Sequence, residues 1–300
     1  MKNGFFDLVT EKVRGTVLRN EPLAHHTSLR VGGPADWFIS PADVEDLRRL
    51  LALLADHGIP YLVIGGGYNL LVRDGGFRGA VISLERFDRL HLLKEGLLDA
   101  ESGVANRALV DFALKKEITG LEFLVGIPGR LGGALAMNAG AGGQTISDSL
   151  SSLVTLKDGI VTSAEKGRLE YGYRYLRLAP GEIIIAASFK LEKGRREGIA
   201  SRMEELLAHR RTVQQAGYPN AGSFFKNPSA GPAWRLIEAA GLRGCQVGGA
   251  QVSEVHANFL VNRGGATAGD FLALADRIRA RVREESGIEL EEEVRIVGEN

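Results

Sequence analysis

Residues 61–76 read YLVIGGGYNLLVRDGG, and this stretch decides the fold class. Its first four residues predict a strand, which runs directly into three glycines at residues 65–67. A helix is predicted before the strand, with Ser40 as its N-cap and Gly58 at its end. A turn signal closes the stretch, and residues 80–84 then predict a second strand with no helix between the two.

The glycine triplet admits more than one interpretation. A Rossmann dinucleotide site needs a third glycine that opens a helix, but Leu70 stands in that position and a turn and a strand follow. Glu85 has about the spacing of that motif's acidic residue, which we interpret as coincidence. The triplet instead lies in a loop between strands. Such a loop either wraps the pyrophosphate of a dinucleotide with its backbone N–H groups or is a structural turn.

A second glycine-rich segment runs from residue 126 to residue 143. Residues 126–134 read GIPGRLGGA, and residues 137–143 read MNAGAGG. Small residues let a flat ring or another backbone approach closely, and so much glycine has an entropic cost that a plain connector does not need. The segment therefore predicts either a site for a flat ring or tight packing of two subdomains.

The rest of the chain mixes helix and strand signals. Strands dominate residues 153–191, and the strongest run is residues 183–187. A charged linker is predicted at residues 194–198, with a domain boundary near residues 195–205. Thr267 is the predicted N-cap of the last and best-defined helix. The predicted helices are residues 106–116, 204–211, 234–240 and 268–285.

The overall composition is that of an ordinary globular protein. The 300 residues carry 37 basic and 37 acidic side chains, so no overall positive field attracts nucleic acid or an anionic membrane. The chain is too long for one comfortable core, which predicts two or three domains. Residues 50–55, the longest apolar run, are too few for the roughly 20 needed to span a bilayer, and residues 1–15 lack a signal-peptide core. The single cysteine, Cys245, favours a reducing compartment.

Three further segments gather side chains that can do chemistry. Residues 171–175 read YGYRY, where packing of an arginine on aromatic rings is the structural alternative. Residues 222–228 read GSFFKNP, where the alternative is a polar turn, and charge pattern alone makes the glutamates at residues 291–293 a solvated run. No phosphate loop, nucleophile elbow or metal-ligand spacing occurs, so no metal site is predicted.

Taken in order, seven segments resemble the UDP-N-acetylenolpyruvoylglucosamine reductase family. The first reads TSLRVGGPAD, and the sixth contains VS and HANF. Seven matches in one order, covering most of the chain, are hard to explain by chance. The segments are residues 27–36, 65–74, 120–140, 171–174, 220–228, 248–262 and 287–298.

The resemblance implies an α+β fold. A two-subdomain FAD-binding fold of the vanillyl-alcohol-oxidase type is followed by an α+β substrate-binding domain. The implied limits are residues 1–85 and 86–200 for the FAD-binding subdomains and 201–300 for the substrate-binding domain, with residues 288–300 returning toward the flavin. The long inserted loop of one subtype has no counterpart in the sequence, so the chain is similar to the shorter subtype.

The resemblance also implies non-covalent FAD as the cofactor and NADPH as the electron donor. Backbone groups of one loop would line the pyrophosphate, and two later segments would approach the flavin ring. The residues implied for the pyrophosphate are Gly65, Gly66, Gly67, Tyr68, Asn69 and Leu70. Those implied for the flavin are Gly126, Ile127, Pro128, Gly129, Gly132, Gly133, Asn138, Ala139 and Gly140.

The implied reaction is reduction of UDP-GlcNAc-enolpyruvate to UDP-N-acetylmuramate in peptidoglycan precursor synthesis. Ser223 matches the family's proton donor. Arg174 and Glu293 match the pair that stabilises the enol-like intermediate. The residues implied to hold the substrate are Tyr173, Lys226, Asn227 and His256.

The chain departs from the family pattern at several positions, among them Gly142, Val255 and Gln214-Gln215, and two departures fall in the predicted cofactor loops. Tyr68 stands where serine is expected, and Arg130 stands where a small or hydroxyl residue is expected. Two alternatives stay open: another FAD oxidoreductase on the same fold, and a catalytically silent UDP-sugar-binding protein, of which Tyr68 and Arg130 would be the signs. In the preferred interpretation the partner is a small-molecule substrate, without nucleic acid or membrane, in the cytoplasm. The oligomeric state stays open, with a monomer favoured.

Overall fold

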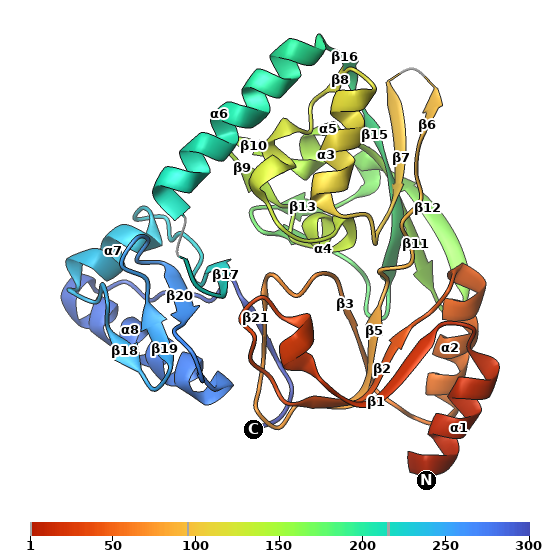
Figure 1. The fold of residues 1–300 in the computed structure, drawn as a ribbon, viewed down its shortest axis with the longest axis horizontal. Coiled ribbons are helices and arrows are strands. Elements are labelled where there is room, and N and C mark those ends of the chain that lie inside the picture. The colour runs from red at the N-terminus through yellow and green to blue at the C-terminus, as the bar shows by residue number, and fades with distance from the viewer. Residues whose placement is uncertain (1, 95, 215–216) are drawn as a thin grey trace. The chain divides into compact units, whose positions relative to one another are not determined.

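The computed structural model describes residues 2–94, 96–214 and 217–300, and its ribbon is shown in Figure 1. The chain divides into two compact units. The first consists of Met1–Arg19, Trp37–Gly66 and Ala80–Arg210, and the second of Asn20–Asp36, Gly67–Gly79 and Arg211–Asn300. In the part of the chain that is described, no helix is both long and apolar enough to cross a bilayer.

The first unit begins with two helices packed on strands. Apolar side chains of both helices, including Phe5, Val9, Leu47 and Leu50, share one core with Trp37 of the sheet. The strand order is β1-β2-β5-β3, and β3 pairs in parallel with β5. The bounds are α1 (Lys2–Lys12), β1 (Thr16–Pro22), β2 (Pro34–Ser40), α2 (Val44–Asp56), β3 (Tyr61–Ile64) and β5 (Phe77–Ser83). The short helix η1 (Leu23–His26), which follows β1 along the chain, belongs to the second unit.

The predicted helix and strand before the glycine loop are present, but the helix starts later than predicted. Asp43, rather than Ser40, is the N-cap of α2, and its carboxylate accepts the N–H of Asp46 at 2.9 Å. Ser40 ends β2, and its hydroxyl donates to Glu85 at 3.1 Å. The Ser40 cap prediction is wrong because the sheet holds this residue in the extended conformation. An Asp N-cap stabilises a helix by about 1 kcal/mol, as a Ser N-cap does, so Asp43 caps α2 as well as the predicted Ser40 would.

A five-stranded antiparallel sheet forms the rest of the first unit. Its order is β12-β11-β15-β7-β6, and Figure 1 shows β11 beside β15. The predicted strand at residues 183–187 is the start of the central β15. Helix α3 and the glycine-rich segment pack on this sheet in one core, which includes buried Leu98, Leu109, Leu131 and Phe189.

Several short elements connect the main ones of this part. The main bounds are β6 (Leu90–Lys94), β7 (Leu97–Glu101), α3 (Asn106–Lys115), β11 (Leu150–Lys157), β12 (Ile160–Glu165) and β15 (Ile183–Lys190). The short helices are η2 (Glu122–Gly126), α4 (Leu131–Ala136), α5 (Ile146–Ser149) and η3 (Lys166–Arg168). The short strands are β8 (Ile118–Thr119), β9 (Gly140–Ala141), β10 (Gln144–Thr145), β13 (Tyr171–Gly172), β14 (Tyr175–Leu176) and β16 (Glu192–Lys193).

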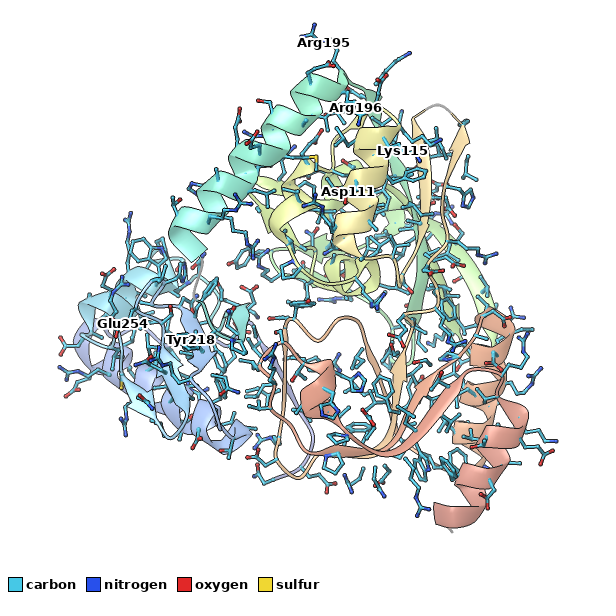
Figure 2. The ribbon with its side chains drawn as sticks, viewed as in Figure 1. Asp111, Lys115, Arg195, Arg196, Tyr218 and Glu254 are labelled. Carbon is cyan, nitrogen blue, oxygen red and sulfur yellow. The ribbon has the colours of Figure 1, made fainter. Side chains whose placement is uncertain are left out.

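Helix α6 (Arg196–Gln214) is longer than predicted. Residues 196–198 of the predicted charged linker are already helical, so that linker prediction is wrong over most of its length. The reason is an apolar pair at helical spacing, Ile199 and Met203, which is buried and fixes the first turns. The charged residues Arg195 and Arg196 are exposed at the start of the helix, where Figure 2 labels them.

The second unit is built on a four-stranded antiparallel sheet, order β17-β20-β19-β18, with two helices. Its core includes buried Phe224, Phe225, Phe271 and Ile278. A parallel pair, β4 with β21, places the C-terminal segment beside the end of the glycine loop. The bounds are β4 (Leu70–Val72), β17 (Asn220–Ser223), α7 (Ala233–Ala239), β18 (Gln246–Val247), β19 (Ala250–Val252), β20 (Phe259–Asn262), α8 (Ala268–Ser286) and β21 (Arg295–Val297).

The last helix, α8, is confirmed close to its predicted bounds. Thr267 is its N-cap, and its hydroxyl and the Asp270 carboxylate form the predicted capping box. The Asp74 carboxylate adds two bonds, accepting the N–H groups of Ala268 and Gly269 at 2.8 Å each. Acidic groups at a helix N-terminus also complement the helix dipole. These bonds fix the turn at Asp74, which follows β4, to the start of α8.

Candidate active site

The two predicted glycine loops meet within the first unit. A Cβ atom built on Gly65 would lie 3.6 Å from the nitrogen and 3.7 Å from the Cα of Gly133. Gly133 belongs to α4, and a Cβ built on it would meet nothing within 4 Å. Small residues allow this close approach and leave space beside Gly133.

Asn106 and Ser102 hold the second glycine loop in place. The Asn106 side chain donates from Nδ2 to the Ile127 carbonyl at 3.1 Å, and its backbone N–H donates to the Gly129 carbonyl at 3.0 Å. The Ser102 carbonyl accepts the N–H of Gly132 at 2.7 Å. A loop without regular secondary structure keeps its shape when its backbone groups are paired in this way.

Two buried polar atoms beside this loop fit a polar ligand. Asn106 Oδ1 and Ser102 Oγ are buried, and no described residue gives either one a hydrogen-bond partner. Such an unpaired atom costs about 1–3 kcal/mol. Small residues, free space and unpaired polar atoms together match a flat ring with hydrogen-bonding edges, such as the flavin of FAD. No group of three metal-ligating side chains is found among the residues that are described.

The side chain of Asn138 fixes the other predicted flavin segment. Its Nδ2 donates to the Gly172 carbonyl at 2.9 Å, and its Oδ1 accepts the Ser147 N–H at 3.2 Å. Asn138 has a φ of 41°, a conformation that surrounding structure must hold in place. The side chain is thus committed to hydrogen bonds within the protein.

Arg174 lies in the first unit beside this segment. Its guanidinium is 5.3 Å from the ring centroid of Tyr173, and its Nη1 donates to the Gly140 carbonyl at 3.5 Å. The cation–π packing considered as the structural alternative is therefore present. The backbone of Arg174 has a φ of 64°, which is uncommon for a residue with a side chain and often marks a functional position.

The second half of the predicted pyrophosphate loop lies in the second unit. Gly67 has a φ of 67°, and a Cβ on it would stand 1.9 Å from the His26 carbonyl oxygen, so this position requires glycine. Tyr68 is 44% exposed, which shows how the loop accommodates a tyrosine in place of serine. Asn69 donates from Nδ2 to the Glu293 carbonyl at 2.9 Å.

Ser223 and Glu293 lie on neighbouring backbone segments of the second unit. The carbonyl of Phe224, the residue after Ser223, accepts the N–H of Glu293 at 2.8 Å. The structure thus brings together two of the three residues predicted for catalysis. Arg174, the third, belongs to the first unit.

The three glutamates at residues 291–293 have three different environments. Glu291 forms an ion pair with Lys226 but is 73% exposed. Glu292 is 21% exposed and forms an ion pair with Arg279 of α8. Glu293 is held by its backbone. The solvated-run interpretation, based on charge alone, is therefore wrong for Glu292, because a base from a distant helix pairs with it.

The side chain of Asn227, which is predicted to hold the substrate, makes a hydrogen bond within the protein. Its Oδ1 accepts the N–H of Ala233 at 3.0 Å, at the start of α7. Lys226 likewise pairs with Glu291. The polar-turn alternative for residues 222–228 is thus also present. Whether either side chain binds substrate stays a prediction.

His256 lies in an aromatic setting. Its ring is 4.4 Å from that of Phe259 and 6.4 Å from that of Trp234. Burial lowers the pKa of His256 below its ordinary value of 6.5. Its Nδ1 is buried, and none of the described side chains or backbone groups pairs with it. A neutral imidazole with an unpaired nitrogen is suited to hydrogen-bond a ligand.

The departure at Arg130 has a local explanation. Its Nη1 donates to the Gly103 carbonyl at 2.6 Å, and its Nη2 lies 3.5 Å from the Glu85 carboxylate. The long side chain is therefore held by groups of its own unit. Glu85, whose spacing from the glycine triplet we interpreted as coincidental, serves here as the counter-ion.

Asn258 has a role that sequence reasoning missed. Its Oδ1 accepts the N–H of Phe225 at 2.9 Å, and its Nδ2 donates to the Phe225 carbonyl at 2.8 Å. Its own carbonyl accepts the N–H of Phe224 at 2.8 Å. The available signal was a polar residue that stands between Ala257 and Phe259. Ser102 and Asn106 were missed as well, and no local pattern singles them out.

Two family descriptions match successive parts of the chain. Residues 35–164 match a family described as FAD binding domain, and residues 214–297 match one described as UDP-N-acetylenolpyruvoylglucosamine reductase, C-terminal domain. The glycine loops of the first unit fall largely within the first match. Ser223, Asn258 and Glu293 fall within the second.

Full-length relatives carry the same reductase name. One from Geotalea uraniireducens is 60% identical over 286 residues, covering 95% of each chain. One from Geobacter metallireducens is 57% identical over 299 residues, covering 100% of each chain. A crystal structure titled UDP-N-acetylenolpyruvylglucosamine reductase, from Thermus caldophilus, superposes with a TM-score of 0.81 at 35% identity, covering 94% of this chain and 98% of that one.

The expected fold class is confirmed by these matches, which combine an FAD-binding part with a C-terminal part of mixed helices and strands. Matches of this identity over nearly the whole length settle the family. The chain belongs to the UDP-N-acetylenolpyruvoylglucosamine reductase family.

Proposed function

We propose that this chain reduces the enolpyruvyl ether of UDP-GlcNAc-enolpyruvate to UDP-N-acetylmuramate, with FAD as cofactor and NADPH as electron donor. The family and the FAD-binding match support the reaction class. The observation that carries the proposal is the bond from the Glu293 N–H to the Phe224 carbonyl. It sets a hydroxyl-bearing residue, Ser223, and a carboxyl-bearing residue on adjoining backbone.

The residues present fit FAD. When bound, FAD supplies two-electron chemistry, taking electrons from NADPH and passing them to the carbon–carbon double bond. The backbone of residues 65–70 would hold the pyrophosphate, and residues 126–133 and 138–140 would approach the ring. Glycine at these positions keeps side chains out of the cofactor's space.

Ser223 is the proposed proton donor. Reduction adds one hydrogen to each carbon of the double bond, and Ser223 Oγ gives its proton to the carbon that bears the carboxylate. Gly222, with a φ of 74°, and a register irregularity in β17 precede it, so Ser223 stands where the strand pairing is distorted. A serine is a weak acid, but the enolate it protonates is a strong base. General acid catalysis of this kind is worth about 10²- to 10⁴-fold in rate.

Arg174 and Glu293 are the proposed stabilisers of the enol-like intermediate. A guanidinium stays protonated at all working pH values and pairs with the substrate carboxylate. Glu293, in its protonated form, donates a hydrogen bond to the developing charge. Preorganised donors of this kind contribute most where charge develops during the reaction.

Four more residues are proposed to hold the substrate. His256 is neutral near pH 7, because burial lowers its pKa, and its unpaired Nδ1 faces no competing partner among the described residues. The ammonium of Lys226 pairs with Glu291, which is largely exposed. It can therefore exchange this partner for the diphosphate of the substrate. Tyr173 and Asn227 complete the proposed set. The substrate and NADPH are cytoplasmic metabolites, and we propose the cytoplasm as the location.

The direct test is an anaerobic turnover assay with FAD-loaded protein, NADPH and UDP-GlcNAc-enolpyruvate. The expected result is NADPH oxidation that requires the substrate, and a product heavier than the substrate by two hydrogens. Product formation without added NADPH, or from an alcohol with oxygen as acceptor, would instead indicate another oxidoreductase. A protein that binds the UDP-sugar without turnover would be the silent binding protein.

A further inference from the structure

Asn69 connects the predicted cofactor loop to the predicted catalytic carboxylate. Its Nδ2 donates to the Glu293 carbonyl at 2.9 Å, and its own carbonyl accepts the N–H of Arg295 at 3.1 Å. A backbone carbonyl only accepts hydrogen bonds, so the side-chain atom facing it must be the amide nitrogen. Asn69 therefore holds the chain on both sides of Val294, through the carbonyl of Glu293 and the N–H of Arg295.

The chain of bonds continues from Glu293 to Ser223. The Glu293 N–H donates to the Phe224 carbonyl at 2.8 Å, and Phe225 forms an isolated bridge with Glu292. A displacement of Glu293 along its segment would thus break the pairing next to Ser223. The two proposed catalytic residues share one hydrogen-bonded framework, and Asn69 is one of its fixed points.

Asn258 fixes the opposite side of the same framework. It bonds to both backbone groups of Phe225, and it is 2% exposed. Asn69 holds the Glu293 segment, while Asn258 holds the Ser223 segment. The two amide side chains therefore hold the two segments that the Glu293–Phe224 backbone bond joins.

The loop that carries Asn69 is also held on the N-terminal side of Asn69, at Gly67. The Gly67 carbonyl accepts the N–H of Ser28 at 3.0 Å, and Gly67 packs directly on the His26 carbonyl. Leu70, the next residue after Asn69, enters β4 and pairs with Arg295 of β21. The side chain of Asn69 is thus presented to Glu293 from a fixed backbone.

We propose that Asn69 is a positioning residue for Glu293, rather than a pyrophosphate ligand through its side chain. This rests on the proposed function, because it assigns Glu293 to the substrate step. Asn69 belongs to the loop that is predicted to line the pyrophosphate, so the residue joins the cofactor loop to the placement of the carboxyl group. A misplacement of about 1 Å can cost roughly 10²-fold in rate.

The test uses FAD-loaded Asn69→Ala and Asn69→Asp. The second variant is nearly isosteric and sets an acceptor against the Glu293 carbonyl. For both, we expect FAD affinity and reduction by NADPH within about threefold of wild type, while substrate reduction slows by about 10- to 100-fold. The pH profile of substrate reduction should shift as well, because the environment of the Glu293 carboxyl group changes. The loss should be larger for Asn69→Asp than for Asn69→Ala.

Asn262→Ala is the matched control. Asn262 makes an equivalent amide-to-carbonyl bond, to Leu29 at 3.0 Å, in the same unit. Its loss should lower the melting temperature without changing the pH profile or separating the two steps. If the Asn69 variants lose FAD affinity and both steps fall equally, the side chain serves the cofactor and the proposal is overturned. Unchanged substrate reduction would also overturn it. A wild-type protein that fails to reduce the substrate would refute the proposed function instead.

Discussion

Two regions that carry predicted functional residues, one in each unit, are built in opposite ways. In the first unit, the loop at residues 126–133 is shaped by its glycines and by hydrogen bonds of its backbone to Ser102 and Asn106. In the second unit, Ser223 and Glu293 are placed by hydrogen bonds between backbone segments, to which the side-chain amides of Asn69 and Asn258 add further bonds. The first region is defined by the space that its glycines leave, and the second by the hydrogen bonds that hold its residues.

This difference decides how each region fails. A glycine-built region is damaged by adding a methyl group, since added bulk enters space that a ligand needs or clashes with backbone. A contact-built region is damaged by removing a partner, which leaves a buried group unpaired at about 1–3 kcal/mol. Substitutions that add a methyl group and substitutions that remove a hydrogen-bonding group therefore affect the two regions differently.

The largest expected effect is that of Ser223→Ala in the contact-built region. We expect substrate reduction to slow by about 10²- to 10⁴-fold, because the proton donor is lost. Reduction of bound FAD by NADPH should stay within about twofold of wild type. Rapid-mixing absorbance measurements of the two steps separate these effects. Ser286→Ala, at the end of α8, is the control and should change neither step. Equal slowing of both steps would refute the donor role.

Gly67→Ala should give the next largest effect. An added Cβ would stand 1.9 Å from the His26 carbonyl oxygen, at a φ of 67° that side chains rarely adopt. We expect a loss of about 3 kcal/mol in the free energy of unfolding, combining conformational strain with the clash. Urea unfolding measures it. A loss below about 0.5 kcal/mol would mean that the loop relaxes easily.

Gly133→Ala and Gly198→Ala form a matched pair. Each glycine is the third residue of a helix, and an added Cβ meets nothing within 4 Å at either position. Both variants should stabilise the apoprotein by about 0.5–1 kcal/mol, since alanine is the better helix residue. Gly133→Ala alone should weaken FAD binding, by about tenfold on flavin titration, if the free space is the cofactor's. Equal FAD affinity in the two variants would place the cofactor elsewhere.

The smallest effect concerns pH and His256. Burial lowers the pKa of His256 in the folded chain below the ordinary 6.5, so below that pH the unfolded chain binds more protons. The free energy of unfolding should therefore be insensitive to this group above about pH 6.5 and should fall as the pH drops from there toward the folded pKa. His256→Gln should reduce that slope in urea unfolding. An identical slope in the variant would show that other groups cause it.

Local signals in the sequence predicted the elements that depend on local chemistry. The capping box of Thr267 and Asp270 and the apolar stripe of α8 lie within one segment, so their prediction was confirmed. The same holds for β3 and its glycine loop. Ser40 was mistaken for a cap because its sheet pairing is non-local. Strand β4 was missed for the same reason, as its partner is the C-terminal β21.

The site was predictable in part. Residue chemistry alone marked the 171–175, 222–228 and 291–293 segments but left each with a structural alternative. The resemblance supplied roles for Ser223 and Glu293, and the structure supplied their adjacency. No pattern in the sequence indicates that Asn69 bonds to Glu293, or Asn258 to Phe225, because both bonds join segments distant along the chain. The ion pair between Glu292 and Arg279 was not predicted for the same reason, because the two residues lie in different segments of the chain.

The central claim is that electrons pass from NADPH through FAD to the enolpyruvyl double bond. The most direct measurement is the visible absorbance spectrum of the FAD-loaded protein without oxygen, recorded before NADPH, after one equivalent of NADPH and after UDP-GlcNAc-enolpyruvate. The account predicts flavin bands that bleach with NADPH and return with that substrate. Flavin that bleaches but stays reduced when the substrate is added, or a protein that cannot retain FAD, would contradict it.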